Sequence, residues 1–330
     1  MADGAKWCLI ESDPGLFTEL IAKMGAKDTQ VEEIYSLDED SLKALNPVYG
    51  LVFLFKWVDE NTSKAQGTQP QGTPATDEET QGIFFAHQVV QNACATQAIL
   101  SIILNKPEIE LNDQLKHFKE FTLELTPDLR GHAIDNSDTI RQAHNSFSPQ
   151  DDFLNDDKPP PTKDGDAFHF ISYVRIDGKL YELDGLKQRP ISHGECTEDN
   201  WLAKAAEVIQ NRMASYAQTE IRFNLMTIIK DRRKLYSEQA SDIDAKIKDL
   251  ESTPNSDNSQ SSIASLKYQK EDLNQKIEQE ETKFARYERD NILRKQNYIP
   301  LIYNLIRDLA ANSDMDKIIN ESRSGKFDYQ

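Results

Sequence analysis

The clearest pattern in the chain is a continuous apolar run over residues 48–57, Val-Tyr-Gly-Leu-Val-Phe-Leu-Phe-Lys-Trp. A short run of this kind predicts a strand that is buried on both faces. Upstream, Ser12-Asp13-Pro14 predicts the start of a helix over residues 15–24, because Ser, Asp and Pro are common at the first positions of helices. Similar signals predict, in chain order, a strand over 7–10, a strand over 31–36 and a helix over 38–45.

Residues 88–104 join a polar segment to an apolar one, Gln-Val-Val-Gln-Asn-Ala-Cys-Ala-Thr-Gln-Ala-Ile-Leu-Ser-Ile-Ile-Leu. The pattern predicts a helix from Asn92 to Leu104, with Asn92 as its N-cap and Cys94 in its first turn. Unpaired N–H groups and the positive end of the helix dipole favour a thiolate there. Because Gln88 lies upstream, its amide can turn back over the sulfur. This is the layout of a cysteine nucleophile whose oxyanion hole combines the Gln88 amide with a backbone N–H.

A structural interpretation of the same segment is that Cys94 is a small buried core residue and Gln88 a surface amide. For an isolated cysteine this is the more frequent case, so the catalytic interpretation requires a base and an orienting group elsewhere in the chain. The other two cysteines carry no such signal. Cys8 lies in a predicted strand, where we expect it in the core, and Cys196 lies in a predicted loop with no evident base beside it.

A hairpin signal supplies both missing groups. Asp177-Gly178 between two apolar runs is typical of a two-residue β-turn, which pairs Ile176 with Lys179. In that register His169 and Asp184 are diagonal neighbours on one face of the hairpin. Such diagonals are ~7–8 Å apart at Cα, within reach of a carboxylate–imidazole hydrogen bond. A structural His–Asp pair is the alternative, but together with a candidate nucleophile the pair predicts a base and its orienter.

Two polar segments interrupt the pattern. Residues 59–80 are rich in Thr, Gln, Gly and Pro, which predicts a flexible surface loop. Residues 148–166 are acidic and contain three consecutive prolines directly before the hairpin, so we expect an active-site lid, with a solvated linker as the alternative. Between the two loops, helical periodicity predicts helices over 111–125 and around 138–146.

The last third of the chain begins with a predicted helix over 201–218 and a core strand over 220–229. From residue 230 onward, two charge-rich helical stretches flank a polar break at 252–262, which predicts an antiparallel helical hairpin with a narrow apolar seam. A solvated stalk is the alternative. Residues 292–309 are too apolar for a stalk, so we expect them to need a partner surface, either the rest of the chain or another protein.

Length and charge restrict the function. At 330 residues, one large domain with an appendage is expected. The net charge of −18 disfavours nucleic acid and anionic membranes as partners, since both need a basic face. Three cysteines fit a reducing compartment, and the absence of a long apolar segment predicts a soluble, intracellular protein. No His/Cys cluster has ligand spacing, so neither a metal nor a cofactor is expected.

These motifs together resemble the ubiquitin C-terminal hydrolase family of cysteine peptidases, and the whole chain resembles its long, proteasome-associated branch. The resemblance covers Trp7-Cys-Leu-Ile-Glu-Ser-Asp-Pro-Gly, the Gln88/Cys94 helix, the His169 strand, Leu180-Tyr-Glu-Leu-Asp-Gly185, Glu220-Ile-Arg-Phe-Asn-Leu-Met226 and Asn297-Tyr-Ile-Pro-Leu-Ile-Tyr-Asn-Leu-Ile-Arg307. It implies an α/β fold: a papain-like core with a knotted backbone and a central antiparallel sheet flanked by helices. It also implies a catalytic domain over residues 1–228 and a helical extension over 229–330.

The resemblance implies Cys94 as nucleophile, His169 as general base and acid, Asp184 as orienter and Gln88 as oxyanion donor. The chain departs from the family in two places. Ala95 replaces a glycine common after the nucleophile, although Ala-Cys-Ala-Thr is typical of the long branch. The sequence also ends without the Lys/Glu/Ala-rich tail of that branch, which bears on anchoring through the tail and leaves catalysis unaffected.

The sequence therefore predicts a deubiquitinating thiol protease that trims ubiquitin chains at the proteasome, in the cytoplasm and nucleus. The resemblance implies as partners ubiquitin, the proteasomal ubiquitin-receptor adaptor and, as a further candidate, a chromatin-remodelling complex. The acidic surface would suit the basic tail of ubiquitin, in which case salt should weaken binding. The alternative is a ubiquitin-binding scaffold with dispensable catalysis, and a cysteine acyltransferase has no support in the sequence.

Overall fold

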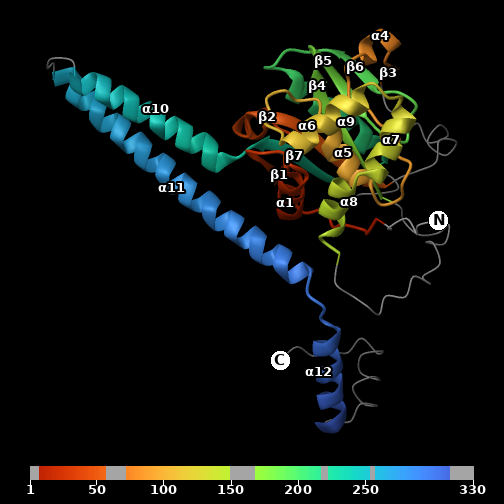
Figure 1. Cartoon of the computed structure of the whole chain (residues 1–330). Coiled ribbons are helices and arrows are strands. Elements are labelled where there is room, and N and C mark those ends of the chain that lie inside the picture. Colours follow the sequence, from red (N-terminus) through yellow and green to blue (C-terminus); the bar gives the residue numbers. More distant parts are fainter. Residues whose placement is uncertain (1–6, 57–71, 149–167, 217–221, 253–256, 313–330) are drawn as a thin grey trace.

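The computed structural model describes residues 7–56, 72–148, 168–216, 222–252 and 257–312. Within these residues the strands form one antiparallel sheet in the order β1-β7-β2-β4-β5-β6-β3 (Figure 1). In chain order they are β1 (Thr29–Glu33), β2 (Val48–Lys56), β3 (Thr73–Pro74), β4 (Phe168–Ile176), β5 (Lys179–Leu183), β6 (Ile191–Glu195) and β7 (Asn224–Lys230). The predicted strand over 48–57 is therefore β2, in the middle of the sheet.

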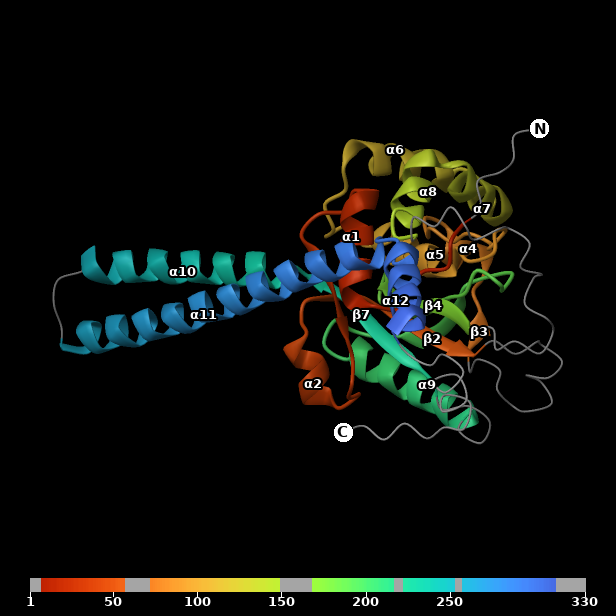
Figure 2. The same cartoon turned by 90° about the horizontal axis from the view of Figure 1, so that it is seen from below.

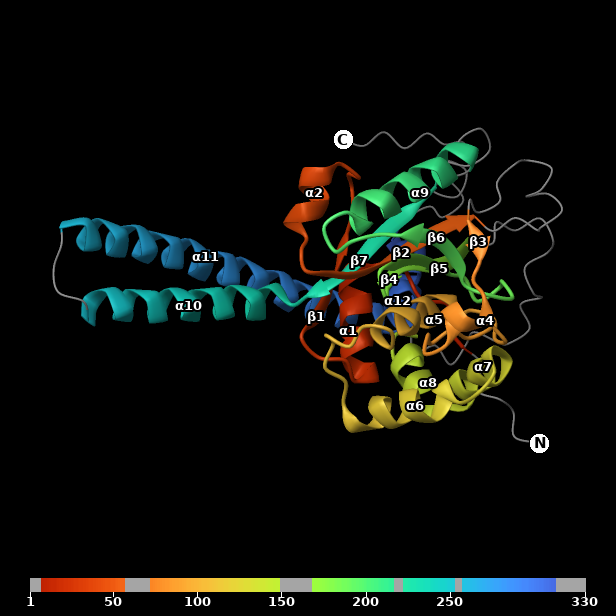
Figure 3. The same cartoon turned by 90° about the horizontal axis from the view of Figure 1, so that it is seen from above.

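Helices cover both faces of the sheet (Figures 2 and 3). One face carries α1 (Pro14–Met24), α5 (Cys94–Ile103), α6 (Asp113–Leu123), α7 (Pro127–Asn136) and α8 (Asp138–Asn145), and the other carries α2 (Glu39–Ala44) and α9 (Trp201–Tyr216). Each face has its own apolar core, with Leu100 of α5 in one and Trp201 of α9 in the other, both buried. This arrangement confirms the predicted α/β class, and the knotted backbone stays a prediction.

The predicted hairpin has the expected register. Ile176 pairs with Lys179 and Ser172 with Leu183, so β4 and β5 are joined by the two-residue turn at Asp177-Gly178. Both turn residues have positive φ, 46° and 77°, as a type I′ turn requires. The local sequence signal alone thus determines how the strand carrying His169 lies against the strand that leads into Asp184.

Residues 7–10 were predicted as a strand, and this is wrong. The hydrogen bonds to the backbone of this segment come from side chains and not from a neighbouring strand. The Trp7 carbonyl accepts from Asn92 Nδ2 at 3.1 Å, the Cys8 N–H donates to Asn145 Oδ1 at 3.0 Å, and the Cys8 carbonyl lies 2.8 Å from His144 Nε2. Because these backbone groups already have hydrogen-bond partners, the segment does not need to pair with a strand.

The prediction of a loop over 59–80 is wrong for its last part. Thr73–Pro74 forms strand β3, which pairs with β6, and Asp77–Thr80 forms the short helix α4. A capping box explains the helix: the Glu79 N–H donates to Thr76 Oγ1, and Glu79 Oε2 accepts from the Thr76 N–H. Residues 59–71 and nearly all of the predicted lid over 148–166 lie outside the described residues.

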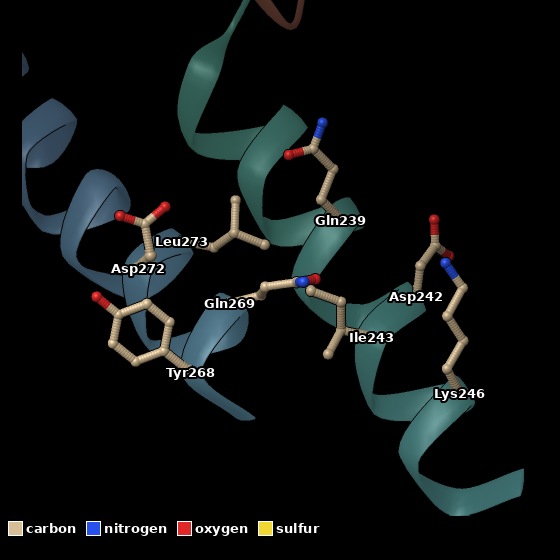
Figure 4. A pocket seen from close by; sticks show the side chains of 8 residues that line it. All are labelled: Gln239, Asp242, Ile243, Lys246, Tyr268, Gln269, Asp272 and Leu273. Atoms are coloured by element: carbon tan, nitrogen blue, oxygen red, sulfur yellow. The ribbon is translucent and has the colours of Figure 1, made fainter. Parts of the chain in front are cut away.

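The predicted helical hairpin is present. α10 (Arg232–Ser252) and α11 (Asp257–Arg294) lie side by side and project away from the sheet (Figure 1). Their narrow seam contains Ala240, Ile243, Ile247 and Leu273. Figure 4 shows the groove beside this seam, where polar side chains from both helices surround Ile243 and Leu273.

The near end of α11 packs against α1. The Asn291 side chain is 1% exposed, and its Nδ2 donates to the Gly15 carbonyl at 3.1 Å and to Glu19 Oε2 at 2.7 Å. Tyr287 covers Gly15 so closely that a Cβ there would lie 2.6 Å from the ring. Farther along, α11 also contacts the edge strand β1, where Gln30 Nε2 donates to Glu280 Oε2 at 3.2 Å and Lys283 pairs with Glu32. The hairpin is therefore fixed to the sheet domain at its base, and the predicted boundary at 228/229 stays a prediction.

We expect Asn291→Ala to destabilise this junction by about 1–3 kcal/mol, because it leaves the buried Gly15 carbonyl without this donor. Urea unfolding followed by circular dichroism measures the change. Asn304→Ala is the matched control, since Asn304 donates only to the Pro300 carbonyl on an exposed helix. An equal effect of the two substitutions would show that the buried contact does not stabilise the docked hairpin.

The last helix, α12 (Ile299–Asn312), stands away from the sheet domain (Figure 1). Its apolar side chains are about half exposed: Leu301 55%, Ile302 51%, Leu305 55%, Ile306 51% and Leu309 47%. The rest of the described chain does not cover this apolar surface, which fits the expectation that it needs a partner. Among the described residues, we find no helix with the length and apolar character needed to span a bilayer.

Candidate active site

Cys94 is the first residue of α5, the helix that packs on strands β4 and β2. The predicted cap is wrong: Ala93 occupies the N-cap position, without a side-chain hydrogen bond, and Asn92 has a left-handed backbone with φ 66°. Asn tolerates this conformation better than most residues, and its side chain is already bound to the Trp7 carbonyl. Because no side chain caps α5, its first N–H groups stay directed toward the region of the thiol.

His169 and Asp184 meet as the hairpin register predicts. His169 Nε2 lies 2.7 Å from Asp184 Oδ1, and both side chains are 5% exposed. The same carboxylate oxygen accepts from the Leu186 N–H at 2.9 Å, which fixes the carboxylate at the end of β5. The second side-chain partner of the imidazole is Cys94.

The surroundings of His169 favour its charged form. Burial lowers the pKa of the imidazole, but hydrogen bonds to Asp184 and to the Cys94 side chain, together with their negative charges, raise it to about 9. His169 therefore contacts both other residues of the candidate triad, the Cys94 thiol and the Asp184 carboxylate. A buried imidazolium beside a cysteine stabilises the thiolate, which is the reactive form of the side chain.

Gln88 lies in the segment that leads to the nucleophile. Its backbone N–H donates to the Gly185 carbonyl at 2.8 Å, so it sits beside the residue that follows Asp184. Its side-chain Nε2 donates to the Val90 carbonyl at 3.1 Å in this structure. The structure thus brings Gln88 to the site, and its service as oxyanion donor stays a prediction.

Comparison with known proteins identifies this arrangement. The family model described as "Ubiquitin carboxyl-terminal hydrolase, family 1" matches residues 7–214, and a second one, described as "Ubiquitin carboxyl-terminal hydrolases", matches residues 271–314. This chain belongs to ubiquitin carboxyl-terminal hydrolase family 1. The family consists of cysteine peptidases, which confirms the predicted enzyme class.

Three relatives of this hydrolase are informative. Ubiquitin carboxyl-terminal hydrolase isozyme L5 of Dictyostelium discoideum is 44% identical over an alignment of 344 positions, which covers 98% of this chain and 97% of the relative. The hydrolase BAP1 of Xenopus tropicalis is 43% identical over 245 residues, 70% of this chain and 35% of BAP1. The crystal structure of Trichinella spiralis UCH37 bound to ubiquitin vinyl methyl ester superposes with a TM-score of 0.62 at 33% identity, covering 85% of this chain and 99% of that one.

One buried histidine that sequence reasoning missed supports the nucleophile helix of this hydrolase. Burial lowers the pKa of His144, which keeps the ring neutral. Its Nε2 then donates to the Cys8 carbonyl at 2.8 Å, and its Nδ1 accepts from Thr96 Oγ1 at 2.7 Å. The Trp7 ring packs on it at 4.8 Å between centroids. His144 thus joins the N-terminal segment to α5, and no local sequence signal predicts this connection.

A second missed cluster lies behind His169. Glu182 is fully buried and accepts from Arg212 Nη1 at 2.7 Å, and it lies 3.3 Å from His193 Nε2. Arg212 is stacked over Phe55 at 4.3 Å, and the Phe55 ring meets His169 edge to face at 5.9 Å. The cation and its carboxylate therefore support the aromatic ring against which His169 packs. Among the described residues, we find no group of three or more His, Cys, Asp or Glu side chains placed to hold a metal ion.

Proposed function

We propose that this protein is a deubiquitinating thiol protease that hydrolyses the bond after the C-terminal glycine of ubiquitin. The observation that carries the proposal is the series Cys94–His169–Asp184, in which one buried imidazole contacts both a partly buried thiol and a buried carboxylate. Family membership supports the substrate, and so does the structure of the Trichinella relative, which is bound to ubiquitin vinyl methyl ester.

The mechanism follows from the three groups. The Cys94 thiolate attacks the glycine carbonyl carbon and a C–S bond forms, while Gln88 Nε2 and the Cys94 N–H donate to the oxyanion. His169 then gives its proton to the leaving amine nitrogen as the C–N bond breaks. A water molecule next loses a proton to His169 and attacks the thioester, the C–S bond breaks, and ubiquitin leaves with a free carboxylate. Asp184 keeps the ring oriented throughout.

Reaction with a ubiquitin that bears a C-terminal electrophile tests the proposal. We expect one covalent adduct per chain, with the modified peptide containing Cys94 and no modification of the buried Cys196. An adduct at Cys8 or Cys196, or none under conditions in which the protein is folded, would reject Cys94 as the nucleophile.

The pH dependence of the reaction follows from the pKa of His169. Because this pKa is raised to about 9, the imidazolium persists up to that pH and is lost above it, so kcat/KM should decline on the basic side near pH 9. Asp184→Asn removes the negative charge that helps raise the pKa. We expect its basic limb to move to lower pH and its kcat to fall by roughly 10²-fold. Profiles with a fluorogenic ubiquitin substrate measure both.

Asp138→Asn is the control for this experiment, because Asp138 is an exposed carboxylate on α8 that pairs with Arg141. Asp138→Asn should give the same pH profile of kcat/KM as the wild type. If Asp184→Asn gave the same basic limb as the wild type, Asp184 could not be the group that sets the charge of His169.

We further propose that α12 binds the ubiquitin-receptor adaptor of the proteasome and that the enzyme trims ubiquitin chains there, in the cytoplasm and the nucleus. The exposed apolar side chains of α12 support a docking role, and the family model over 271–314 includes the whole of this helix. A chromatin-remodelling complex is the second partner that we propose. Co-purification with proteasomes tests the first: Leu305→Asp should abolish it while hydrolysis of small ubiquitin substrates persists.

The exposed face of α12 also supports the alternative of a scaffold whose catalysis is dispensable. Replacing Cys94 by Ala in cells separates the two. A scaffold keeps its function in the complex, whereas a protease loses it.

A further inference from the structure

His87 precedes the oxyanion donor Gln88 and bridges two segments of the site. Its Nδ1 lies 2.8 Å from Asp128 Oδ1 at the start of α7, and its Nε2 lies 3.1 Å from the Gln188 carbonyl oxygen. The ring also meets Phe85 edge to face, at 5.6 Å between centroids and an interplanar angle of 86°. Its side chain is 23% exposed, so the ring is largely enclosed by these neighbours.

The segment that His87 reaches through Gln188 is the turn that follows the orienting carboxylate. This turn begins at Asp184, whose carbonyl accepts from the Lys187 N–H at 2.9 Å. In the segment of His87, the N–H of the next residue, Gln88, donates to the Gly185 carbonyl at 2.8 Å. A Cβ on Gly185 would lie 3.2 Å from the Gln88 Cβ, so the two segments approach each other closely. The His87–Gln188 contact thus closes a second connection beside the Gln88–Gly185 bond.

The backbone of His87 is held as firmly as its ring. Its N–H donates to the Pro127 carbonyl at 2.9 Å, and its own carbonyl lies so close to Gly131 that a Cβ there would come within 2.2 Å. The start of α7 therefore contacts residue 87 from one side, and the turn after Asp184 contacts it from the other. These contacts therefore also restrict the position of the next residue, Gln88.

The two contacts of the ring differ in strength. Both ring nitrogens face acceptors, a carboxylate oxygen and a carbonyl oxygen. The Asp128 side chain is 72% exposed, which weakens that bond through solvent screening. The bond to the Gln188 backbone joins two segments of the site directly, so we expect it to matter more for geometry.

From this geometry we propose that His87 is a positioning residue, which holds the segment bearing the oxyanion donor Gln88 against the turn that follows Asp184. The inference rests on the proposed function, since it assigns His87 a role in the same reaction. Both ring nitrogens of His87 face acceptors of the protein itself, so the role that we assign to it is indirect. It acts through Gln88, whose amide must meet the oxyanion in the transition state.

Three variants of the full chain test the proposal with a fluorogenic ubiquitin substrate. His87→Ala removes both ring contacts, and we expect kcat to fall ~10-fold with KM unchanged, a part of the loss caused by deleting an oxyanion donor outright. Gln at this position places an amide nitrogen near Nε2 and keeps a donor for the Gln188 carbonyl. Asn places its nitrogen near Nδ1 and keeps only the donor for Asp128. We expect His87→Gln to recover most of kcat and His87→Asn to resemble Ala.

A double variant separates positioning from a general structural role. If His87 acts through Gln88, adding His87→Ala to Gln88→Ala causes no further loss, because the donor it positions is already absent. Alkylation of Cys94 by iodoacetamide needs no oxyanion hole, so its rate in His87→Ala should equal that of the wild type. Multiplying losses in the double variant, slowed alkylation, or equal kinetics of the Gln and Asn variants would each overturn the inference. Turnover by the wild type and labelling of its Cys94 test the proposed function itself. Failure of these two tests would reject the proposed function, whereas failure of the variant tests alone would reject only the role of His87.

Discussion

Replacing Cys94 by Ala should reduce ubiquitin hydrolysis by about 10⁶-fold, to the background of the assay, while leaving the fold intact. The reason is that the thiolate forms the covalent intermediate, and no neighbouring group can take its place. Cys94 is the first residue of α5, and the hydrogen bond between Thr96 and His144 should still hold this helix in place after the substitution. The measurement is turnover of a ubiquitin C-terminal amide, with thermal unfolding as the check on folding.

Cys94→Ser is the informative companion to this variant. A serine hydroxyl keeps the size and the hydrogen bond but is not ionised by an imidazolium, so activity should be almost as low as in the Ala variant. Both variants should still bind ubiquitin, because only the reacting atom has changed. Substantial residual turnover in Cys94→Ala would mean that another residue carries the chemistry.

Arg212→Met should destabilise the protein by roughly 3–5 kcal/mol, the cost of leaving a buried charge without its partner. Glu182 has no exposed surface, and burial alone would raise its pKa; the charge of Arg212 and the contact with His193 instead lower it to about 2. Without Arg212 the carboxylate loses its strongest counter-charge. Phe55 loses the guanidinium stacked on it as well, so the ring against which His169 packs is less well held. Urea denaturation gives the loss in the free energy of unfolding.

The surface pair Arg189–Asp77 supplies the control, because Arg189 is 45% exposed and Arg189→Met should cost under about 1 kcal/mol. A double variant tests the cause: Glu182→Gln combined with Arg212→Met removes the buried charge together with its partner, so it should be more stable than Arg212→Met alone. If the double variant were no better, the loss would come from packing and not from the unpaired carboxylate.

The parts of the site that the sequence predicts well are those set by local signals. The turn at Asp177-Gly178 fixes the register of β4 and β5, and that register brings His169 to Asp184 without any long-range information. The start of α1 is equally local, since Asp13 caps the helix by accepting from the Leu16 N–H. Hydrophobic periodicity likewise predicts the hairpin of α10 and α11, although the second helix begins earlier than the polar break suggests.

The parts that could not be predicted depend on residues far apart in the sequence. Asn92 looks like a cap, but its side chain binds Trp7, which lies 85 positions away, and its backbone is left-handed. The same partner explains why residues 7–10 form no strand. His87 and His144 carry no motif, and each is defined by contacts with segments distant in the chain. A single sequence does not specify such contacts until the fold brings their partners together.

The position of α11 beside β1 has a consequence for handling the protein in pieces. β1 is an outermost strand, paired with β7 on one side, and side chains of α11 reach it through Glu280 and Lys283. An uncovered strand edge offers unpaired backbone groups to any second chain. A fragment that ends after β7, at residue 230, would lose the α11 contacts to Gln30 and Glu32 of this edge strand, so self-association during purification should increase on truncation even though every group of the active site is retained.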